Sequence, residues 1–92
     1  MQKIITMFMS MNDLSLFSVI AEKQPFDVDV RYGRYIANGK SLLNLISLNL
    51  LKSKIEVVIH GEPEQNKKFI EGLRNKGFEL WLDQENMAEC YK

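Results

Sequence analysis

One segment of the chain alternates between large apolar and charged side chains, and this period of two is the strongest limit on the fold. The apolar members are Phe26, Val28, Val30 and Tyr32, and the charged members between them are Asp27, Asp29 and Arg31. Successive side chains of a β-strand point to opposite faces, so the pattern predicts a strand with one face buried and the other in water. We therefore expect a sheet that is covered on one side.

Three other segments have the composition of strands, namely residues 1–9, 34–37 and 55–60. The last of these is rich in β-branched residues and suits the centre of a sheet. Gly33 favours a tight reversal between the alternating segment and residues 34–37, because glycine tolerates the backbone angles of turns. These two strands are expected to form a hairpin.

Apolar residues at helical spacing predict helices over residues 14–23, 41–51 and 63–76. In the first helix we expect one buried side, formed by Leu16, Phe17, Val19 and Ile20. Pro25 prevents the first helix from continuing, and Gly77 suits the end of the third. In the second helix the leucines occupy more than one face. One of these faces is expected in the core, and the surplus leucines need another explanation.

The expected order of elements is β-α-β-β-α-β-α, an α+β fold of the open-faced β-sandwich type. Three helices would cover one face of a mostly antiparallel, four-stranded sheet. Residues 1–77 would form this domain, and residues 78–92 would be a C-terminal extension. Within the extension, apolar residues recur at every second position, at Phe78, Leu80 and Leu82. This spacing indicates either an added edge strand or a self-association arm that forms a homodimer.

Composition argues against nucleic acid and membrane as partners. The 92 residues suit one domain, and their 12 basic and 12 acidic side chains are mostly interspersed, so no strong field of one sign is expected. No apolar stretch is long enough to span a bilayer, the apolar start lacks a secretory cleavage site, and Cys90 is the only cysteine. We expect a cytoplasmic protein without a disulfide, metal or cofactor.

Two stretches of sequence carry a resemblance to a known family: Phe26-Asp27-Val28-Asp29-Val30, and the apolar run that begins with Lys40-Ser41-Leu42-Leu43 and ends at Leu50. With the element order, they resemble the phosphocarrier HPr family of the bacterial sugar phosphotransferase system. The resemblance extends over residues 4–73 and implies the same open-faced fold. In that family a Gly-[Leu/Ile]-His-[Ala/Thr]-Arg-Pro motif opens the first helix, and its histidine carries phosphate from enzyme I to sugar-specific carriers.

This chain departs from the family at the residue that does the chemistry. Counting back from Phe26 places Asn12 at the histidine, Leu14 at the arginine and Ser15 at the proline. An amide cannot be the nucleophile in phosphoryl transfer, and an aliphatic side chain supplies no cation to steady the phosphate. His60 is the only histidine, and the resemblance puts it at the end of the fourth strand, away from the first helix. We therefore expect no catalytic residue and no enzyme activity.

Ser41 corresponds to the serine that a dedicated ATP-dependent kinase phosphorylates in many Gram-positive members of the family. That serine lies at the start of the second helix, where unpaired N–H groups and the helix dipole favour a phosphate. The alternative is that Ser41 only caps the helix.

The resemblance also implies a docking surface for protein partners. Its aligned positions on the second helix are Leu42, Leu43 and Ile46, and Phe17 of the first helix is expected to join them. Exposed apolar patches often mark binding surfaces, and such a patch would account for the surplus leucines. Burial in the core is the alternative for Leu42 and Leu43.

Three functions follow from these observations. The first is a regulatory, protein-binding HPr-like protein that retains the serine and lacks the histidine, and that binds a phosphotransferase-system component, a kinase or a transcriptional regulator. The second is an interaction or oligomerisation module of the same fold without a phosphotransferase role. The third is a phosphocarrier that uses His60 or a histidine borrowed from a partner.

Overall fold

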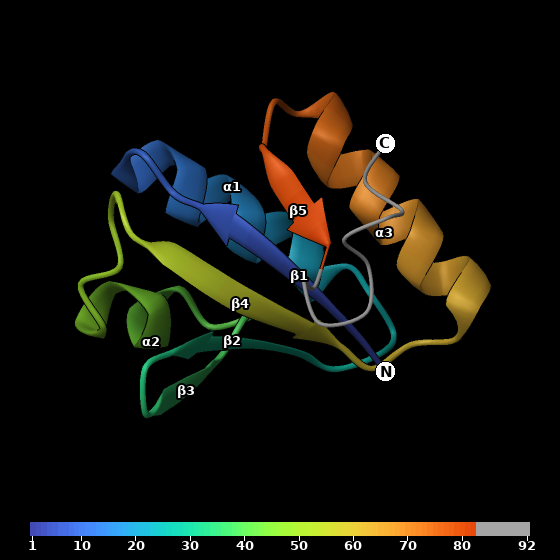
Figure 1. Cartoon of the computed structure of the whole chain (residues 1–92), viewed down its shortest axis with the longest axis horizontal. Coiled ribbons are helices and arrows are strands. Elements are labelled where there is room, and N and C mark those ends of the chain that lie inside the picture. The colour runs from blue at the N-terminus through green and yellow to red at the C-terminus, as the bar shows by residue number, and fades with distance from the viewer. Residues whose placement is uncertain (83–92) are drawn as a thin grey trace.

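The computed structural model describes residues 1–82, in which one antiparallel sheet is packed against three helices (Figure 1). The strands are β1 (Gln2–Met7), β2 (Val28–Tyr32), β3 (Tyr35–Asn38), β4 (Lys54–Ile59) and β5 (Leu80–Leu82), in the sheet order β3-β2-β4-β1-β5. The helices are α1 (Met11–Glu22), α2 (Leu42–Ser47) and α3 (Pro63–Asn75). None of these helices has the length and apolar character needed to cross a membrane.

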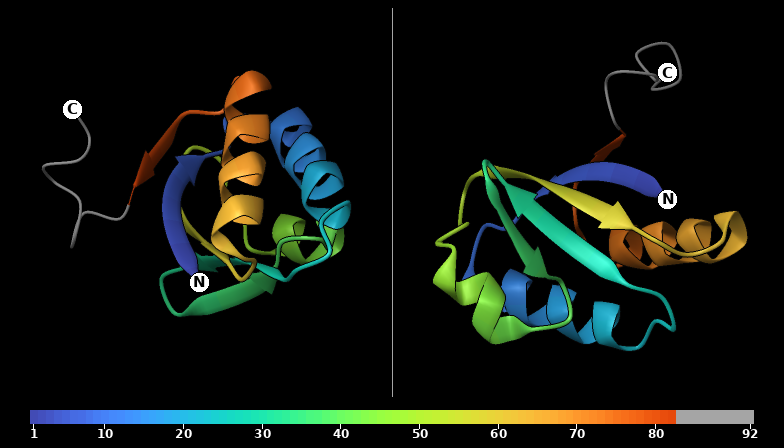
Figure 2. Two further views of the ribbon diagram at one scale, coloured as in Figure 1. Left: turned by 90° about the vertical axis from the view of Figure 1, so that its right-hand side faces the viewer. Right: turned by 90° about the horizontal axis from the view of Figure 1, so that it is seen from below.

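All three helices lie on the same face of the sheet, as expected (Figure 2). Pairing between strands places four residues in one row across the sheet, Ile4, Val57, Val30 and Ala37, and all four are buried. The adjacent row points to the face without helices and consists of Ile5, Glu56, Arg31 and Ile36. The one-sided burial predicted from the alternating segment is therefore confirmed.

The sheet has five strands, so the expectation of four is wrong. β5 pairs antiparallel with β1, with Leu80 opposite Thr6. The Thr6 side chain is fully buried, and its hydroxyl donates a hydrogen bond of 2.7 Å to the Glu79 carbonyl oxygen. The start of the C-terminal extension thus covers the edge of β1, which would otherwise present unpaired backbone groups. The rest of the extension, Cys90 included, lies outside the described residues.

α2 is shorter than the apolar pattern indicates. It ends at Ser47, after which Asn49 and Lys52 adopt left-handed backbone conformations with φ of 55° and 64°. A left-handed residue ends a helix, and asparagine tolerates that conformation better than most residues. Leu50 is nevertheless fully buried. It enters the core from the loop after the helix, which the spacing of apolar residues does not reveal.

Four phenylalanine rings pack together between α1 and the rest of the domain, and we call them the phenylalanine cluster. They are Phe8, Phe17, Phe69 and Phe78. The ring centroid of Phe17 lies 5.1 Å from that of Phe8, 6.2 Å from that of Phe69 and 6.3 Å from that of Phe78. Tilted and edge-to-face pairs at such distances are favourable. Because these rings come from α1, from α3 and from the residues that follow β1 and precede β5, the cluster fixes α1 against the sheet.

We predict that Phe78→Ala lowers the free energy of unfolding by about 3 kcal/mol or more, because it leaves a cavity in the phenylalanine cluster. Urea denaturation followed by circular dichroism measures this change. Tyr35→Ala is the control, since Tyr35 is 63% exposed and its truncation is expected to cost less than about 1 kcal/mol. Similar losses in both variants would contradict the assignment of Phe78 to the domain core.

Candidate functional site

Side chains of Ser10 and Asp13 cap the start of α1. Ser10 is the N-cap residue, and its hydroxyl accepts a hydrogen bond of 3.4 Å from the Asp13 N–H. In return, a carboxylate oxygen of Asp13 accepts a hydrogen bond of 2.9 Å from the Met9 N–H. These bonds satisfy backbone donors at the helix start, and the carboxylate supplies the negative charge that the helix dipole favours there.

This arrangement differs from what a phosphohistidine site needs. The helix begins at Met11, so Asn12 is its second residue and the N-cap lies two positions earlier, at Ser10. Leu14 is 1% exposed and belongs to the core, whereas Ser15 is exposed. Asp13 lies in the first turn of α1, where its carboxylate repels an anion.

His60 lies far from this helix start, as the resemblance implied. Ile59, the last residue of β4, pairs with Gln2 at the beginning of β1, whereas α1 follows the other end of β1. A six-residue strand spans about 17 Å from first to last residue. The His60 ring nitrogen Nε2 lies 3.0 Å from a carboxylate oxygen of Asp29, on the face of the sheet without helices.

Ser41 is the N-cap residue of α2, as expected for a serine before this helix. Its hydroxyl accepts a hydrogen bond of 3.4 Å from the Asn44 N–H. The preceding residue fastens this end of α2 to α1, because the Lys40 carbonyl oxygen accepts from the Ser18 hydroxyl at 3.3 Å and the Lys40 ammonium donates to the Gln24 carbonyl oxygen at 2.8 Å. These bonds hold the residue before Ser41 beside the second half of α1 and the segment that follows it.

The predicted docking residues fall into two groups. Leu43 is 80% exposed and Ile46 is 41% exposed, so both are available to a partner. Leu42 is only partly exposed and packs against the core. Phe17 is fully buried in the phenylalanine cluster, so its side chain lies outside any docking surface. The leucines of α2 are therefore divided between the surface and the core. Leu43 is exposed, whereas Leu45, two residues later, is fully buried.

Two apolar residues of α1 that the sequence analysis did not assign to the surface lie on its exposed side. Met11 is 48% exposed and Val19 is 45% exposed. They share one stripe of the helix with Ser15 and Glu22, because these residues follow at intervals of four, four and three. The stripe is next to Ser18, whose hydroxyl donates to the carbonyl oxygen of Lys40, the residue before the N-cap of α2, and the two helices lie side by side (Figure 2).

We call Met11, Val19, Leu43 and Ile46 the helix surface. The expectation that Val19 is buried with Leu16, Phe17 and Ile20 is wrong, and Met11 precedes the predicted start of the helix at residue 14. Within residues 1–82, His, Cys, Asp and Glu side chains form no group of three or more that could hold a metal ion. Each of the four apolar side chains of the helix surface is at least 41% exposed.

Comparison with known proteins agrees with the fold. No family model matches the sequence, and no curated protein matches it either. The structure is similar to the crystal structure of HPr-C-His from Thermoanaerobacter tengcongensis, with a TM-score of 0.65 and 18% sequence identity. The match covers 83% of this chain and 94% of that chain. The chain therefore has an HPr-like fold.

We predict that Leu43→Ala and Leu45→Ala, the same substitution two residues apart, have different effects on stability. Leu45 is fully buried, so its truncation should lower the free energy of unfolding by about 2–5 kcal/mol. Leu43 is 80% exposed, so its truncation should change that free energy by less than about 0.5 kcal/mol. Guanidinium denaturation measures both. A loss at Leu43 as large as that at Leu45 would place Leu43 in the core and remove it from the helix surface.

Proposed function

We propose that this chain is an HPr-like, protein-binding regulator related to the phosphoenolpyruvate-dependent sugar phosphotransferase system, and that it is not a histidine phosphocarrier. It is not an enzyme, and it acts in the cytoplasm by docking a protein partner against the helix surface. The partner is a phosphotransferase-system component, a kinase or a transcriptional regulator. Nucleic acid and membrane are not its targets.

One observation carries this proposal: the start of α1 lacks the family's histidine, whereas the exposed side of α1 presents apolar side chains. At the start, where the resemblance calls for a histidine, Ser10 and Asp13 close the helix with hydrogen bonds to the backbone. Beside it, apolar side chains are exposed on α1 and α2. Loss of the chemical group together with retention of an apolar face supports binding without phosphoryl transfer.

Phosphorylation of Ser41 would control this docking. The hydroxyl is partly exposed at the start of α2, and it neighbours Leu42 and Leu43 in sequence. A phosphate there adds close to two negative charges beside the helix surface. It would favour partners that present arginine or lysine next to an apolar face and would weaken binding of partners that present acidic groups.

Intact mass after two separate phosphorylation reactions tests the proposal. One reaction contains enzyme I and phosphoenolpyruvate, and the other contains HPr kinase and ATP. We predict that the protein gains one phosphoryl group only with ATP, and that Ser41→Ala abolishes the gain while His60→Ala does not.

A gain with phosphoenolpyruvate that His60→Ala abolishes would instead make the chain a phosphocarrier with a relocated histidine. No gain with either donor would remove Ser41 control and favour an interaction module without a phosphotransferase role.

A further inference from the structure

A hollow of about 380 Å³ lies between the start of α1 and the segment that joins α3 to β5. It is lined by Met7, Met9, Asp13, Gly77, Phe78 and Glu79. Its volume is at the lower end of the range for small-ligand sites. The hollow therefore has room for one long side chain.

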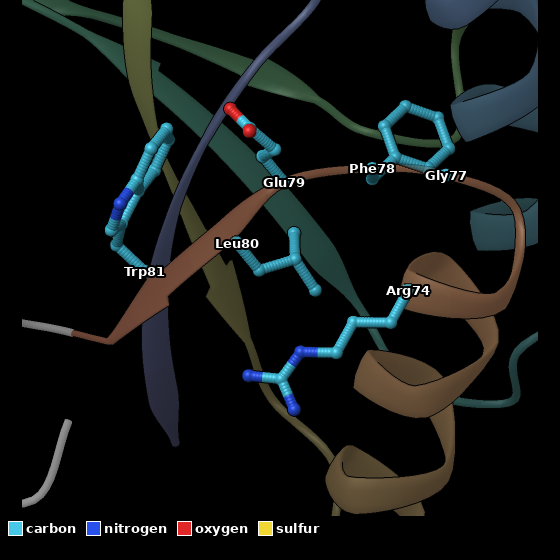
Figure 3. Close-up of a pocket in the computed structure, with 6 residues that line it drawn as sticks. All are labelled: Arg74, Gly77, Phe78, Glu79, Leu80 and Trp81. Carbon is cyan, nitrogen blue, oxygen red and sulfur yellow. The ribbon is translucent and has the colours of Figure 1, made fainter. Parts of the chain in front are cut away.

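Both ionisable residues in this lining are acidic. Asp13 and Glu79 carry carboxylates, and the other four lining residues carry no charge. The ion pairs among residues 1–82 are Arg31 with Glu56 and His60 with Asp29, so neither acidic residue is paired with a described cation. Arg74 extends from α3 and lies on the opposite side of the segment that leads into β5 from the Glu79 side chain (Figure 3). Within residues 1–82, no ion pair neutralises these two carboxylates.

Hydrogen bonds hold the side chain of Asp13 and the backbone of Glu79 in position. The Asp13 carboxylate accepts from the Met9 N–H at 2.9 Å, and the Glu79 carbonyl oxygen accepts from the buried Thr6 hydroxyl at 2.7 Å. The wall that contains Asp13 is therefore bonded to the start of α1, and the wall that contains Glu79 is bonded to β1. A site whose walls are already ordered loses less entropy when it binds.

We propose that this hollow receives one lysine or arginine side chain of a protein partner. The two carboxylates attract a cation and repel phosphate or an acidic segment. The thioethers of Met7 and Met9 suit the aliphatic stem of such a side chain, since methionine adapts its shape and long cationic side chains bury their stems on apolar surface. The inference rests on the proposed protein-binding role and adds the chemistry that the partner must present.

The test uses the full chain, labelled with ¹⁵N, and N-acetyl-L-arginine N-methylamide as the probe. The citrulline analogue is the matched control, because it has nearly the same shape and no charge. We predict saturable shifts of the Asp13, Gly77 and Glu79 amide signals with the arginine probe, with a Kd on the order of millimolar. Added salt should weaken this binding. Equal shifts with the citrulline analogue would overturn the proposal.

A double variant, Asp13→Asn with Glu79→Gln, separates charge from structure. The new side-chain amide at position 13 can still accept from the Met9 N–H, and the Glu79 carbonyl bond to Thr6 is a backbone bond that the change leaves in place. We predict a loss of roughly fivefold or more in affinity for the arginine probe. Arg74→Gln, a charge change on the other side of the segment, should leave the affinity unchanged.

Unchanged affinity in the double variant would also overturn the proposal. This test needs neither a phosphoryl donor nor the helix surface. Its failure would therefore not contradict the proposed regulatory role, which the mass measurement tests separately. Conversely, failure of the mass measurement would not alter the binding of the arginine probe.

Discussion

The packing of Phe17 against Phe8, Phe69 and Phe78 is the interaction on which the rest of the structure depends. These rings fasten α1 to the residues that follow β1, to α3 and to the segment that leads into β5. Because Phe17 points into the core, Met11 and Val19 must lie on the side of the helix that faces water. The same packing brings residues 77–79 beside the start of α1, where they form the acidic hollow. One buried contact therefore positions both candidate binding regions.

Much of this architecture could be predicted from the sequence. The alternation around Val28 and Val30 predicted a sheet buried on one side, and apolar spacing predicted three helices, because both signals report burial directly. The fifth strand was not settled, since three residues that alternate fit an edge strand or an arm equally well. Individual site residues were harder to place. Leu43 and Leu45 are the same residue type, and only the phase and length of α2 decide that one is exposed and the other buried.

The two regions differ in the kind of contact they offer. The helix surface is apolar and adjoins Ser41, at which a phosphate would add negative charge beside it. The hollow is acidic and is built from Asp13, the residue that also closes the start of α1. An HPr-like fold is therefore combined here with a helix start that disfavours anions. The absence of a nucleophile and the presence of a carboxylate at the same helix end both support the proposed binding without phosphoryl transfer.

The most direct measurement of this central claim is a titration of the ¹⁵N-labelled protein with inorganic phosphate, followed through the amide signals of Met11, Asn12 and Asp13. The Ser10 hydroxyl caps the Asp13 N–H, and the Asp13 carboxylate places a negative charge at this helix end, so we predict no saturable shift of these signals at constant pH and ionic strength. Saturable shifts confined to these amides would show that the start of α1 still binds a phosphate, and would contradict the account.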